Sequence, residues 1–465
     1  MNNEDTICAI ATGQGGAIGI IRVSGHDAIN ITDKIFEPAG KNGKPLSERE
    51  AYTIAYGQIK NGNGEVVDDV LVSLFRAPHS YTGEDSVEIS CHASTYILQQ
   101  VMQLLVNNGC RTAEPGEYTR RAFLNGKMDL SQAEAVADLI ASSTAATHRL
   151  ALNQMRGAFS NELSVLRDKM LHLTSLMELE LDFSDHEELE FADRSELDDI
   201  ARQIEQIVSK LVASFSLGNA IKKGVPVAII GETNAGKSTL LNTLVGEDRA
   251  IVSDIHGTTR DVIEDTVNID GIMFRFIDTA GIRDTTDTIE KLGIDRTFKK
   301  IEQASIIIWV VDPTDTTEKT ETLAAQIFPL CNDKQLIIAL NKADIATVST
   351  IPQFKDLPAH VQNISISAKQ GTNIDKLKHM LTDAAGIPTI ATGDVIVTNV
   401  RHYEALKATL TTIKRVREGI SQNLSADLIS QDLRECIHNI AEIVGGEITS
   451  EETLQNIFKH FCIGK

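Results

Sequence analysis

Residues 231–238 read Gly-Glu-Thr-Asn-Ala-Gly-Lys-Ser and match the spacing G-x-x-x-x-G-K-[ST] at every fixed position. Residues of these types can cradle a phosphate chain. The glycines let consecutive backbone amides face the phosphates, Lys237 reaches the β- and γ-phosphate oxygens, and Ser238 offers a hydroxyl group to Mg2+. An apolar, β-branched run from Val225 to Ile230 precedes the motif and a helical pattern follows it. This context of strand, glycine turn and helix favours a phosphate-binding loop over a chance glycine turn.

Four further motifs follow in the order used by guanine-nucleotide sites. Residues 257–261, Gly-Thr-Thr-Arg-Asp, offer a threonine hydroxyl to Mg2+, and residues 278–281, Asp-Thr-Ala-Gly, offer a carboxylate that can hold a magnesium-bound water. The carboxylate of Asp344, in the Asn-Lys-Ala-Asp motif 341–344, can accept from two donors of guanine that adenine lacks. Residues 367–369 supply a second base-contacting loop, so the motifs together predict GTP rather than ATP. The residues predicted to contact GTP are Asn234, Ala235, Gly236, Lys237, Ser238, Thr239, Ser253, Asp254, Ile255, His256, Gly257, Thr258, Thr259, Asp278, Thr279, Ala280, Gly281, Asn341, Lys342, Asp344, Ser367, Ala368 and Lys369.

The residue after the Asp-Thr-Ala-Gly motif is Ile282, at the position where Ras-like proteins have the glutamine that orients the attacking water. An isoleucine side chain cannot position water, so another group must do so. Glu290 precedes Lys-Leu-Gly at the expected start of a helix and is the predicted catalytic residue. A solvent-exposed carboxylate at a helix start is the alternative interpretation.

A chain of 465 residues is too long for one hydrophobic core, so we expect roughly two to four domains. Its formal charge of -21 would repel a bare polyphosphate backbone, so an RNA substrate would need a local basic patch or a partner protein. The six cysteines show no C-x-x-C pair and are expected to be reduced thiols. No apolar run reaches the roughly 20 residues of a membrane span and the polar start is not a signal peptide, so we expect a cytoplasmic protein.

Proline placement and apolar periodicity divide the chain into parts of different fold class. We expect an α/β multidomain protein with an α+β N-terminal domain and all-α helical segments on both sides of a central Ras-like P-loop GTPase domain. The expected boundaries are 1–118 for the N-terminal domain, 119–221 and 387–465 for the two helical segments, and 222–386 for the GTPase domain. In the N-terminal domain we expect strands over residues 6–11, 17–23, 52–59, 66–75 and 87–91 and a helix over residues 93–106.

The flanking parts carry helical patterns. Residues 131–134, Ser-Gln-Ala-Glu, fit a capping box that opens a helix, and residues 150–181 continue with apolar residues three and four apart. The acidic segment 182–199 predicts a solvated loop; a metal site built from its carboxylates is an alternative that lacks ligand-type spacing. Residues 426–440 and 453–461 are predicted to be amphipathic helices.

With these parts assembled, the sequence closely resembles the MnmE (TrmE) family of tRNA-modification GTPases over essentially its whole length. The segments that carry the resemblance are 15–18 (Gly-Gly-Ala-Ile), 21–25 (Ile-Arg-Val-Ser-Gly), 81–85 (Tyr-Thr-Gly-Glu-Asp), 115–117 (Pro-Gly-Glu), 121–125 (Arg-Ala-Phe-Leu-Asn), 234–238 (Asn-Ala-Gly-Lys-Ser), 257–261 (Gly-Thr-Thr-Arg-Asp) and 461–465 (Phe-Cys-Ile-Gly-Lys).

The resemblance implies an N-terminal domain that binds tetrahydrofolate and forms a homodimer, and a GTPase domain inserted between the two parts of the helical domain. It implies that a folate, 5-formyl- or methylene-tetrahydrofolate, contacts Arg22, Glu88, Lys127 and Lys465. A pterin ring offers donors to a carboxylate, and a glutamate tail offers carboxylates to cations. By residue type alone, Arg22, Glu88 and Lys127 are ordinary solvated or salt-bridged surface groups, so the site assignment comes from the resemblance.

The resemblance also implies that a potassium ion replaces an arginine finger when two GTPase domains meet. A fixed monovalent cation would supply the charge stabilisation that the finger gives elsewhere, and Glu290 matches the family's catalytic glutamate. The residues implied around potassium are Asn234, Ser253, Ile255 and Thr258, and those implied around magnesium are Ser238 and Thr259.

The function implied is GTP-dependent addition of a carboxymethylaminomethyl or aminomethyl group to C5 of the wobble uridine of certain tRNAs. A flavin-containing (FAD) partner of the MnmG (GidA) family would act with it in a heterotetramer. Methylene-tetrahydrofolate would supply one carbon, and glycine or ammonium the amine. A regulatory GTPase that acts as a conformational switch and a ribosome-assembly GTPase are the alternatives.

Two segments depart from the family pattern. Thr233 stands in the phosphate-binding loop where many relatives have proline, which loosens the turn without removing a ligand. Residues 89–94 read Ile-Ser-Cys-His-Ala-Ser, where relatives tend to have Gly-His-Gly-Gly. The added side chains are expected to crowd the folate pocket.

Overall fold

A computed structural model gives the fold of the chain. It describes residues 5–13, 15–40, 43–182, 194–247, 265–277, 301–313, 317–331, 333–345, 361–388, 393–446, 454, 457–459, 461 and 464. The chain forms two compact units, the first of residues 1–140, 154–168 and 434–465, the second of residues 141–153 and 169–433. In the part that the structure describes, no helix is both long and apolar enough to cross a bilayer.

The first unit contains a seven-stranded sheet in the order β3-β4-β5-β6-β2-β1-β7, with every pair antiparallel except β1 and β7. Its strands are β1 (Ile7–Ile10), β2 (Ile18–Ser24), β3 (Phe36–Pro38), β4 (Ile54–Lys60), β5 (Val66–Phe75), β6 (Ser86–His92) and β7 (Arg111–Thr112). Its helices are α1 (Ala28–Asp33), the 3-10 helix η1 (Leu46–Glu48), α2 (Thr95–Asn107), α3 (Glu117–Leu124) and α4 (Leu130–Ala141). The α+β prediction is confirmed, and each predicted strand is present within two residues at either end.

Alternation along the strands gives this sheet a buried face and an open face. Val87 and Ile89 of β6 point into a core shared with α2, while Glu88 between them points to the other face. Helix α3 covers part of that other face, where Tyr118 packs on Ile7. The face is otherwise open over β4 and β5.

The boundaries of the helices differ from the expectation in three places. Helix α4 begins at Leu130 rather than at Ser131, because Asp129 caps it: its Oδ1 accepts from the amide of Gln132 at 2.9 Å, and Oε1 of Gln132 accepts from the Asp129 amide at 3.0 Å. The predicted helix over residues 150–181 is interrupted at Gly157, whose φ is +85°. The acidic loop was predicted to extend to residue 199, but residues 194–199 are helical.

Among the described residues, five further helices flank the second sheet in the sequence. They are α5 (Ala145–Met155), α6 (Ala158–Asp182), α7 (Arg194–Lys223), α13 (Val400–Ser421) and α14 (Ala426–Val444), so the predicted helix over residues 426–440 is confirmed. Within the second unit α7 packs along α13, where Arg417 pairs with Asp198 at 3.0 Å and Phe215 stacks on Tyr403 with ring centroids 4.2 Å apart. Helix α7 leads directly into the second sheet. Of the predicted helix over residues 453–461, residues 454, 457 and 458 are helical and residues 459 and 461 are not, while residues 453, 455, 456 and 460 lie outside the described part of the chain.

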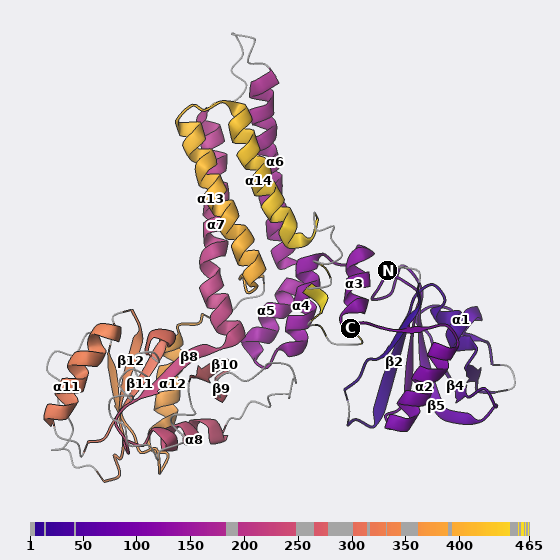
Figure 1. The fold of residues 1–465 in the computed structure, drawn as a ribbon, viewed down its shortest axis with the longest axis horizontal. Helices are drawn as coiled ribbons and strands as arrows, with labels where there is room; N and C mark the ends of the chain where they lie inside the picture. Colours follow the sequence, from indigo (N-terminus) through magenta and orange to yellow (C-terminus); the bar gives the residue numbers. More distant parts are fainter. Residues whose placement is uncertain are drawn as a thin grey trace. The chain divides into compact units, whose positions relative to one another are not determined.

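The second unit contains a six-stranded sheet in the order β13-β12-β11-β8-β10-β9, parallel except for β9 (Figure 1). Its strands are β8 (Val225–Ile230), β9 (Asp265–Ile269), β10 (Ile272–Phe276), β11 (Ile306–Val311), β12 (Gln335–Leu340) and β13 (Gln362–Ser365). Helices α8 (Lys237–Glu247) and α12 (Ile374–Ala385) pack on one face, and α11 (Thr317–Ile327), followed by the 3-10 helix η2 (Phe328–Cys331), on the other. Covering both faces explains why β11 is apolar at every position. The predicted Ras-like α/β domain is confirmed.

Candidate functional site

The phosphate-binding loop follows β8, at the carboxyl edge of the parallel strands, where ligands of such sheets bind. The loop passes through positive φ at Gly231 (+141°), Asn234 (+64°) and Gly236 (+99°). A Cβ added at Gly231 would lie 2.2 Å from the carbonyl oxygen of Val310, and one added at Gly236 would lie 2.1 Å from Nδ2 of Asn341. Both glycines are therefore required by close packing as well as by conformation.

Lys237 begins α8, and Ser238 lies in its first turn. The ammonium group of Lys237 donates to the carbonyl oxygens of Gly231 at 2.9 Å and of Glu232 at 2.7 Å. The lysine is thus held along the loop, beside the amides of the helix N-terminus, which attract anions. The ammonium group of Lys237, the amides of the helix N-terminus and the hydroxyl group of Ser238 therefore lie close together. Such a group of donors can bind phosphate and magnesium.

Asn341 joins the loops on either side of the site. Its side chain is buried; Nδ2 donates to the carbonyl oxygen of Ala235 at 2.8 Å, and Oδ1 accepts from the amide of Ala368 at 2.9 Å. The sequence motif suggested a direct contact to GTP. In the structure its amide group connects the phosphate-binding loop to the loop 367–369, and the contact to GTP stays a prediction.

Asp344 and Ser367 are also brought together. The hydroxyl group of Ser367 donates to Oδ1 of Asp344 at 2.8 Å and accepts from the amide of Gln370 at 3.3 Å. One carboxylate oxygen of Asp344 is thereby fixed by the second predicted base-contacting loop. This hydrogen bond restricts the orientation of the carboxylate group. A carboxylate held in this way can accept hydrogen bonds from two donors on one edge of a base.

Two side chains that sequence reasoning missed complete this arrangement. Thr243 of α8 shares its hydroxyl proton between the carbonyl oxygens of Thr239 at 2.9 Å and Ala368 at 2.8 Å. Asp312 forms an ion pair with Lys342. Only the position of Asp312 directly after an apolar strand could have pointed to it, because polar residues at strand ends gather at the carboxyl edge of a parallel sheet.

Many predicted site residues lie outside the described part of the chain. They are Ser253, Asp254, Ile255, His256, Gly257, Thr258, Thr259, Asp278, Thr279, Ala280, Gly281, Ile282, Glu290 and Lys465.

The second candidate site lies on the sheet of the first unit, where Arg22 and Glu88 are direct cross-strand neighbours. Nε and Nη2 of Arg22 donate to Oε1 of Glu88 at 3.0 and 2.8 Å. The guanidinium carbon lies 5.6 Å from the ring centroids of both Tyr81 and Tyr118. Nη1 of Arg22 also donates to the carbonyl oxygen of Gly464 at 3.2 Å. An arginine, a carboxylate and two aromatic rings therefore meet at one point.

Lys127 contacts the loop 78–84, which also carries Tyr81. Its ammonium group donates to the carbonyl oxygen of Pro78 at 3.0 Å, and its side chain lies against Gly83 of the same loop. Of the predicted folate residues, Arg22 and Glu88 are in direct contact. Lys127 and Arg22 both contact the loop 78–84, Lys127 at Pro78 and Arg22 at Tyr81. In the variant segment, Cys91 is buried in the core and His92 pairs with Asp68 at 2.8 Å, so neither side chain points at Arg22.

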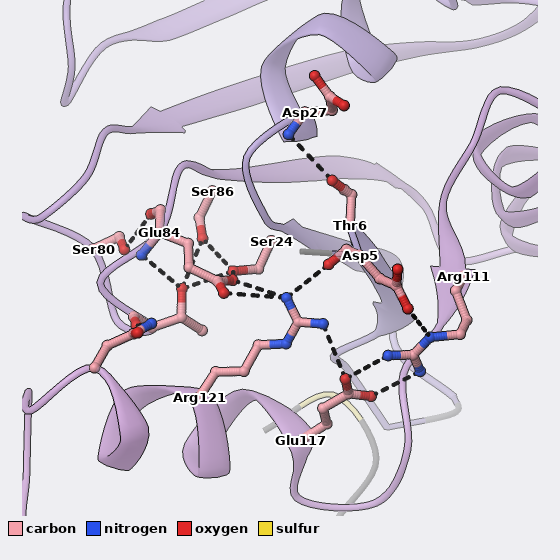
Figure 2. A network of polar contacts seen from close by, with 12 residues as sticks. Asp5, Thr6, Ser24, Asp27, Ser80, Glu84, Ser86, Arg111, Glu117 and Arg121 are labelled. Carbon is pink, nitrogen blue, oxygen red and sulfur yellow. Dashed lines mark hydrogen bonds and ion pairs between the residues drawn. The ribbon is translucent and has the colours of Figure 1, made fainter. Parts of the chain in front are cut away.

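A buried network of ion pairs fixes the loop 78–84 against α3 (Figure 2). Arg121, 3% exposed, donates to Glu117 at 3.1 Å and to Glu84 at 3.1 Å, and Arg111 donates to Glu117 at 2.7 Å. Burial alone would raise the pKa of Glu117, but hydrogen bonds from Arg111, the Glu114 amide and Arg121 outweigh it and hold the pKa below its ordinary value. The network thereby holds both tyrosine-bearing segments around Arg22.

Comparisons with known proteins agree with these features. The family described as "MnmE helical domain" matches residues 130–462, and that described as "GTP-binding protein TrmE N-terminus" matches residues 6–127. Curated proteins named "tRNA modification GTPase MnmE" are 64% identical in Bacteroides thetaiotaomicron, 63% in Bacteroides fragilis strain ATCC 25285 and 48% in Flavobacterium johnsoniae, each over 100% of both chains. A solved variant of Aquifex aeolicus Era bound to GDP and AlF4- is 26% identical, and the match covers 40% of this chain and 66% of that one with a TM-score of 0.26.

Proposed function

The chain belongs to the MnmE family of tRNA modification GTPases and is a GTP hydrolase, and we propose that it binds GTP at the carboxyl edge of the second sheet and a folate on the first sheet. The guanine base is read by Asp344, and the phosphates lie on the amides of residues 234–239 with Lys237 at their side. The observation that carries this proposal is the bridge made by Asn341 between Ala235 and Ala368, because it aligns the phosphate loop and the base loop without a ligand.

The test of the base assignment replaces the exocyclic amino group of guanine, one of the two donors proposed to bind Asp344, with the carbonyl oxygen of xanthine. Asp344→Asn should weaken GDP binding and strengthen binding of xanthosine diphosphate, measured by calorimetry, because an amide can donate to the extra carbonyl oxygen of xanthine. Asp333→Asn, at an exposed position, is the matched control. Unchanged GDP affinity in Asp344→Asn would remove Asp344 from the site.

Ser238 and Thr259 are proposed to hold magnesium, which would neutralise charge on the phosphates. Asn234, Ser253, Ile255 and Thr258 are proposed to surround a potassium ion. Support comes from the phosphate loop itself, since Asn234 is exposed there and has a left-handed backbone conformation. Turnover measured in KCl and in NaCl of equal ionic strength tests this, and equal rates would reject it.

Glu290 is proposed to order the attacking water. Glu290→Ala should abolish turnover and leave the affinity for GTP unchanged, because the side chain acts on water rather than on the nucleotide. Preserved turnover would assign the role to another residue.

A tetrahydrofolate derivative, 5-formyl- or methylene-tetrahydrofolate, is proposed to bind at Arg22, Glu88, Lys127 and Lys465. The donor set fits, because Glu88 can accept from pterin donors while the cations can pair with the carboxylates of a glutamate tail. Arg22→Gln should abolish binding of 5-formyl-tetrahydrofolate in calorimetry, and Lys44→Gln, at an exposed position, should leave it intact. Equal binding by both variants would refute the site.

The first unit is proposed to form a homodimer through the open face of its sheet. Large apolar side chains on that face are exposed over several strands, as an interface between two copies would explain. They are Ile18 (66% exposed), Ile54 (65%), Tyr56 (56%) and Leu71 (47%).

The product proposed is a tRNA that carries a carboxymethylaminomethyl or aminomethyl group on C5 of its wobble uridine, made in the cytoplasm with an MnmG-type FAD protein in a heterotetramer. The formal net charge of -21 would repel the RNA backbone, which supports the proposal that the partner makes most of the contacts to the tRNA. Nucleoside analysis of tRNA from cells that lack the protein tests this. A normal content of modified wobble uridine would refute it.

A further inference from the structure

We propose that Asp312 is a positioning residue of the guanine-nucleotide site, which holds Lys342 in place and so slows release of the bound nucleotide. The inference rests on the proposed GTP site and adds to it a residue outside the motifs that predicted the site. It is carried by a contact between the ends of two neighbouring strands.

Asp312 directly follows β11, and Lys342 comes two residues after β12. The two strands are parallel neighbours in which Val311 pairs with Leu340, and the amide of Asn341 donates to the carbonyl oxygen of Val311 at 2.9 Å. The other neighbour of β11 is β8, the strand that runs into the phosphate-binding loop. Asp312 therefore stands at the carboxyl edge of the sheet, between the phosphate loop and the base-reading motif.

The ammonium group of Lys342 forms an ion pair with Oδ2 of Asp312. The aspartate side chain is 9% exposed and the lysine side chain 33%. A carboxylate with so little access to water is costly unless a cation compensates it, so the aspartate holds the lysine firmly.

The ion pair counteracts a strained backbone. Lys342 has a φ of +61°, in the left-handed region that costs free energy for a residue with a Cβ. The amide of Ala343 donates to the carbonyl oxygen of Ile366 at 2.9 Å, and together with the ion pair this fixes the turn from both ends. The turn carries Asn341 inward on one side and Asp344 toward Ser367 on the other. Loss of the ion pair would therefore loosen the residue proposed to read guanine.

The experiment measures release of a fluorescent GDP analogue in stopped flow from the full-length protein. Asp312→Ala is expected to raise the release rate on the order of tenfold, which corresponds to about 1.4 kcal/mol, since Lys342 loses a charge-assisted contact. Asp312→Asn, which keeps the shape and one acceptor oxygen, should give a smaller increase. Asp333→Asn, an exposed aspartate, is the control and should leave the rate unchanged.

A double-mutant cycle separates positioning from a general loss of stability. If Asp312 acts through Lys342, then Asp312→Ala should change the release rate less than roughly twofold in the background of Lys342→Ala. An equal factor in both backgrounds, or no change in Asp312→Ala alone, would overturn the proposal. Asp344→Asn in the same assay tests the guanine site separately from the role of Asp312. Unchanged GDP release in Asp344→Asn would refute the proposed guanine site itself. Faster release in Asp344→Asn with an unchanged rate in Asp312→Ala would refute only the role of Asp312.

Discussion

The hydroxyl group of Thr243 donates to the carbonyl oxygen of Ala368 at 2.8 Å, across 125 positions of sequence. The contact joins the helix that begins at the phosphate-binding loop to the loop proposed to contact the base. Asn341 makes a second link between the same two regions through Ala235. The phosphate and base halves of the site are therefore held in register by side chains, not only by the sheet beneath them.

Removing the hydroxyl group of Thr243 should weaken nucleotide binding. Thr243→Val keeps the shape of the side chain but leaves the carbonyl oxygen of Ala368 without this donor, at a cost of about 1 kcal/mol, or roughly fivefold in the dissociation constant of GDP. Thr243→Ser retains the donor and should bind GDP as the wild type does. Calorimetry measures the GDP affinity of both variants. Equal affinities would show that the hydrogen bond from Thr243 to Ala368 contributes nothing to nucleotide binding.

Asn341→Ala should have a larger effect than Thr243→Val. The substitution leaves the carbonyl oxygen of Ala235 and the amide of Ala368 without their partner in a buried place, which costs about 2 kcal/mol or more and lowers GDP affinity roughly thirtyfold or more. The phosphate loop should be loosened as well, because Gly236 packs directly on the Asn341 amide. Hydrogen exchange of residues 231–238 would report that loosening, and unchanged exchange would contradict it.

Local signals in the sequence predicted the strands, the order of motifs and the fold class, because they depend on alternation and on glycine turns. The strand over residues 66–75 shows this, since it is rich in β-branched and other apolar residues, follows the turn signal at residues 61–64, and corresponds to β5 with the same bounds. The short α1, β3 and β7 were missed. Each is six residues or fewer and too short to show a period.

Contacts between distant residues could not be predicted in the same way. Asp198 was assigned to an acidic loop, but it lies in α7 because Arg417, 219 positions away, and Arg202 neutralise it. Asp312 and Thr243 likewise acquire a role only through partners on other strands and loops. The capping residue of α4 was misplaced for a local reason: two overlapping boxes, Asp129 with Gln132 and Ser131 with Glu134, fit the same pattern, and the earlier one forms.

The ion pairs of Glu117 predict a pH dependence of stability in the first unit. Because its pKa in the folded protein is lowered, Glu117 contributes stability that is complete above its ordinary value of 4.5 and is lost as the pH falls through the lowered value. Glu117→Gln leaves Arg111 and Arg121 without this counter-ion and should destabilise the unit by about 3 kcal/mol near neutral pH. The difference from wild type should shrink below pH 4.5.

Hydrogen exchange of peptides from residues 111–124 is the suitable measurement. The single tryptophan, Trp309, lies in the second unit and its fluorescence would report the wrong part of the chain. Glu114→Gln, at a neighbouring carboxylate for which the structure gives no ion pair among the described residues, serves as the control. A difference between wild type and Glu117→Gln that is the same at all pH values would refute the assignment of the lowered pKa.

The open sheet face offers the last test. Leu71 and Tyr56 are direct cross-strand partners on that face, with 47% and 56% of their surface exposed. Leu71→Glu should convert a homodimer into a monomer in sedimentation, because a carboxylate buried between two copies would lack a partner. The fold of the monomer should survive, since the substituted side chain is not part of the core. Asp69→Asn, an exposed substitution on the same strand and face, should leave the dimer intact. A Leu71→Glu protein that sediments as a dimer would exclude this face as the interface, whatever the state of the nucleotide site.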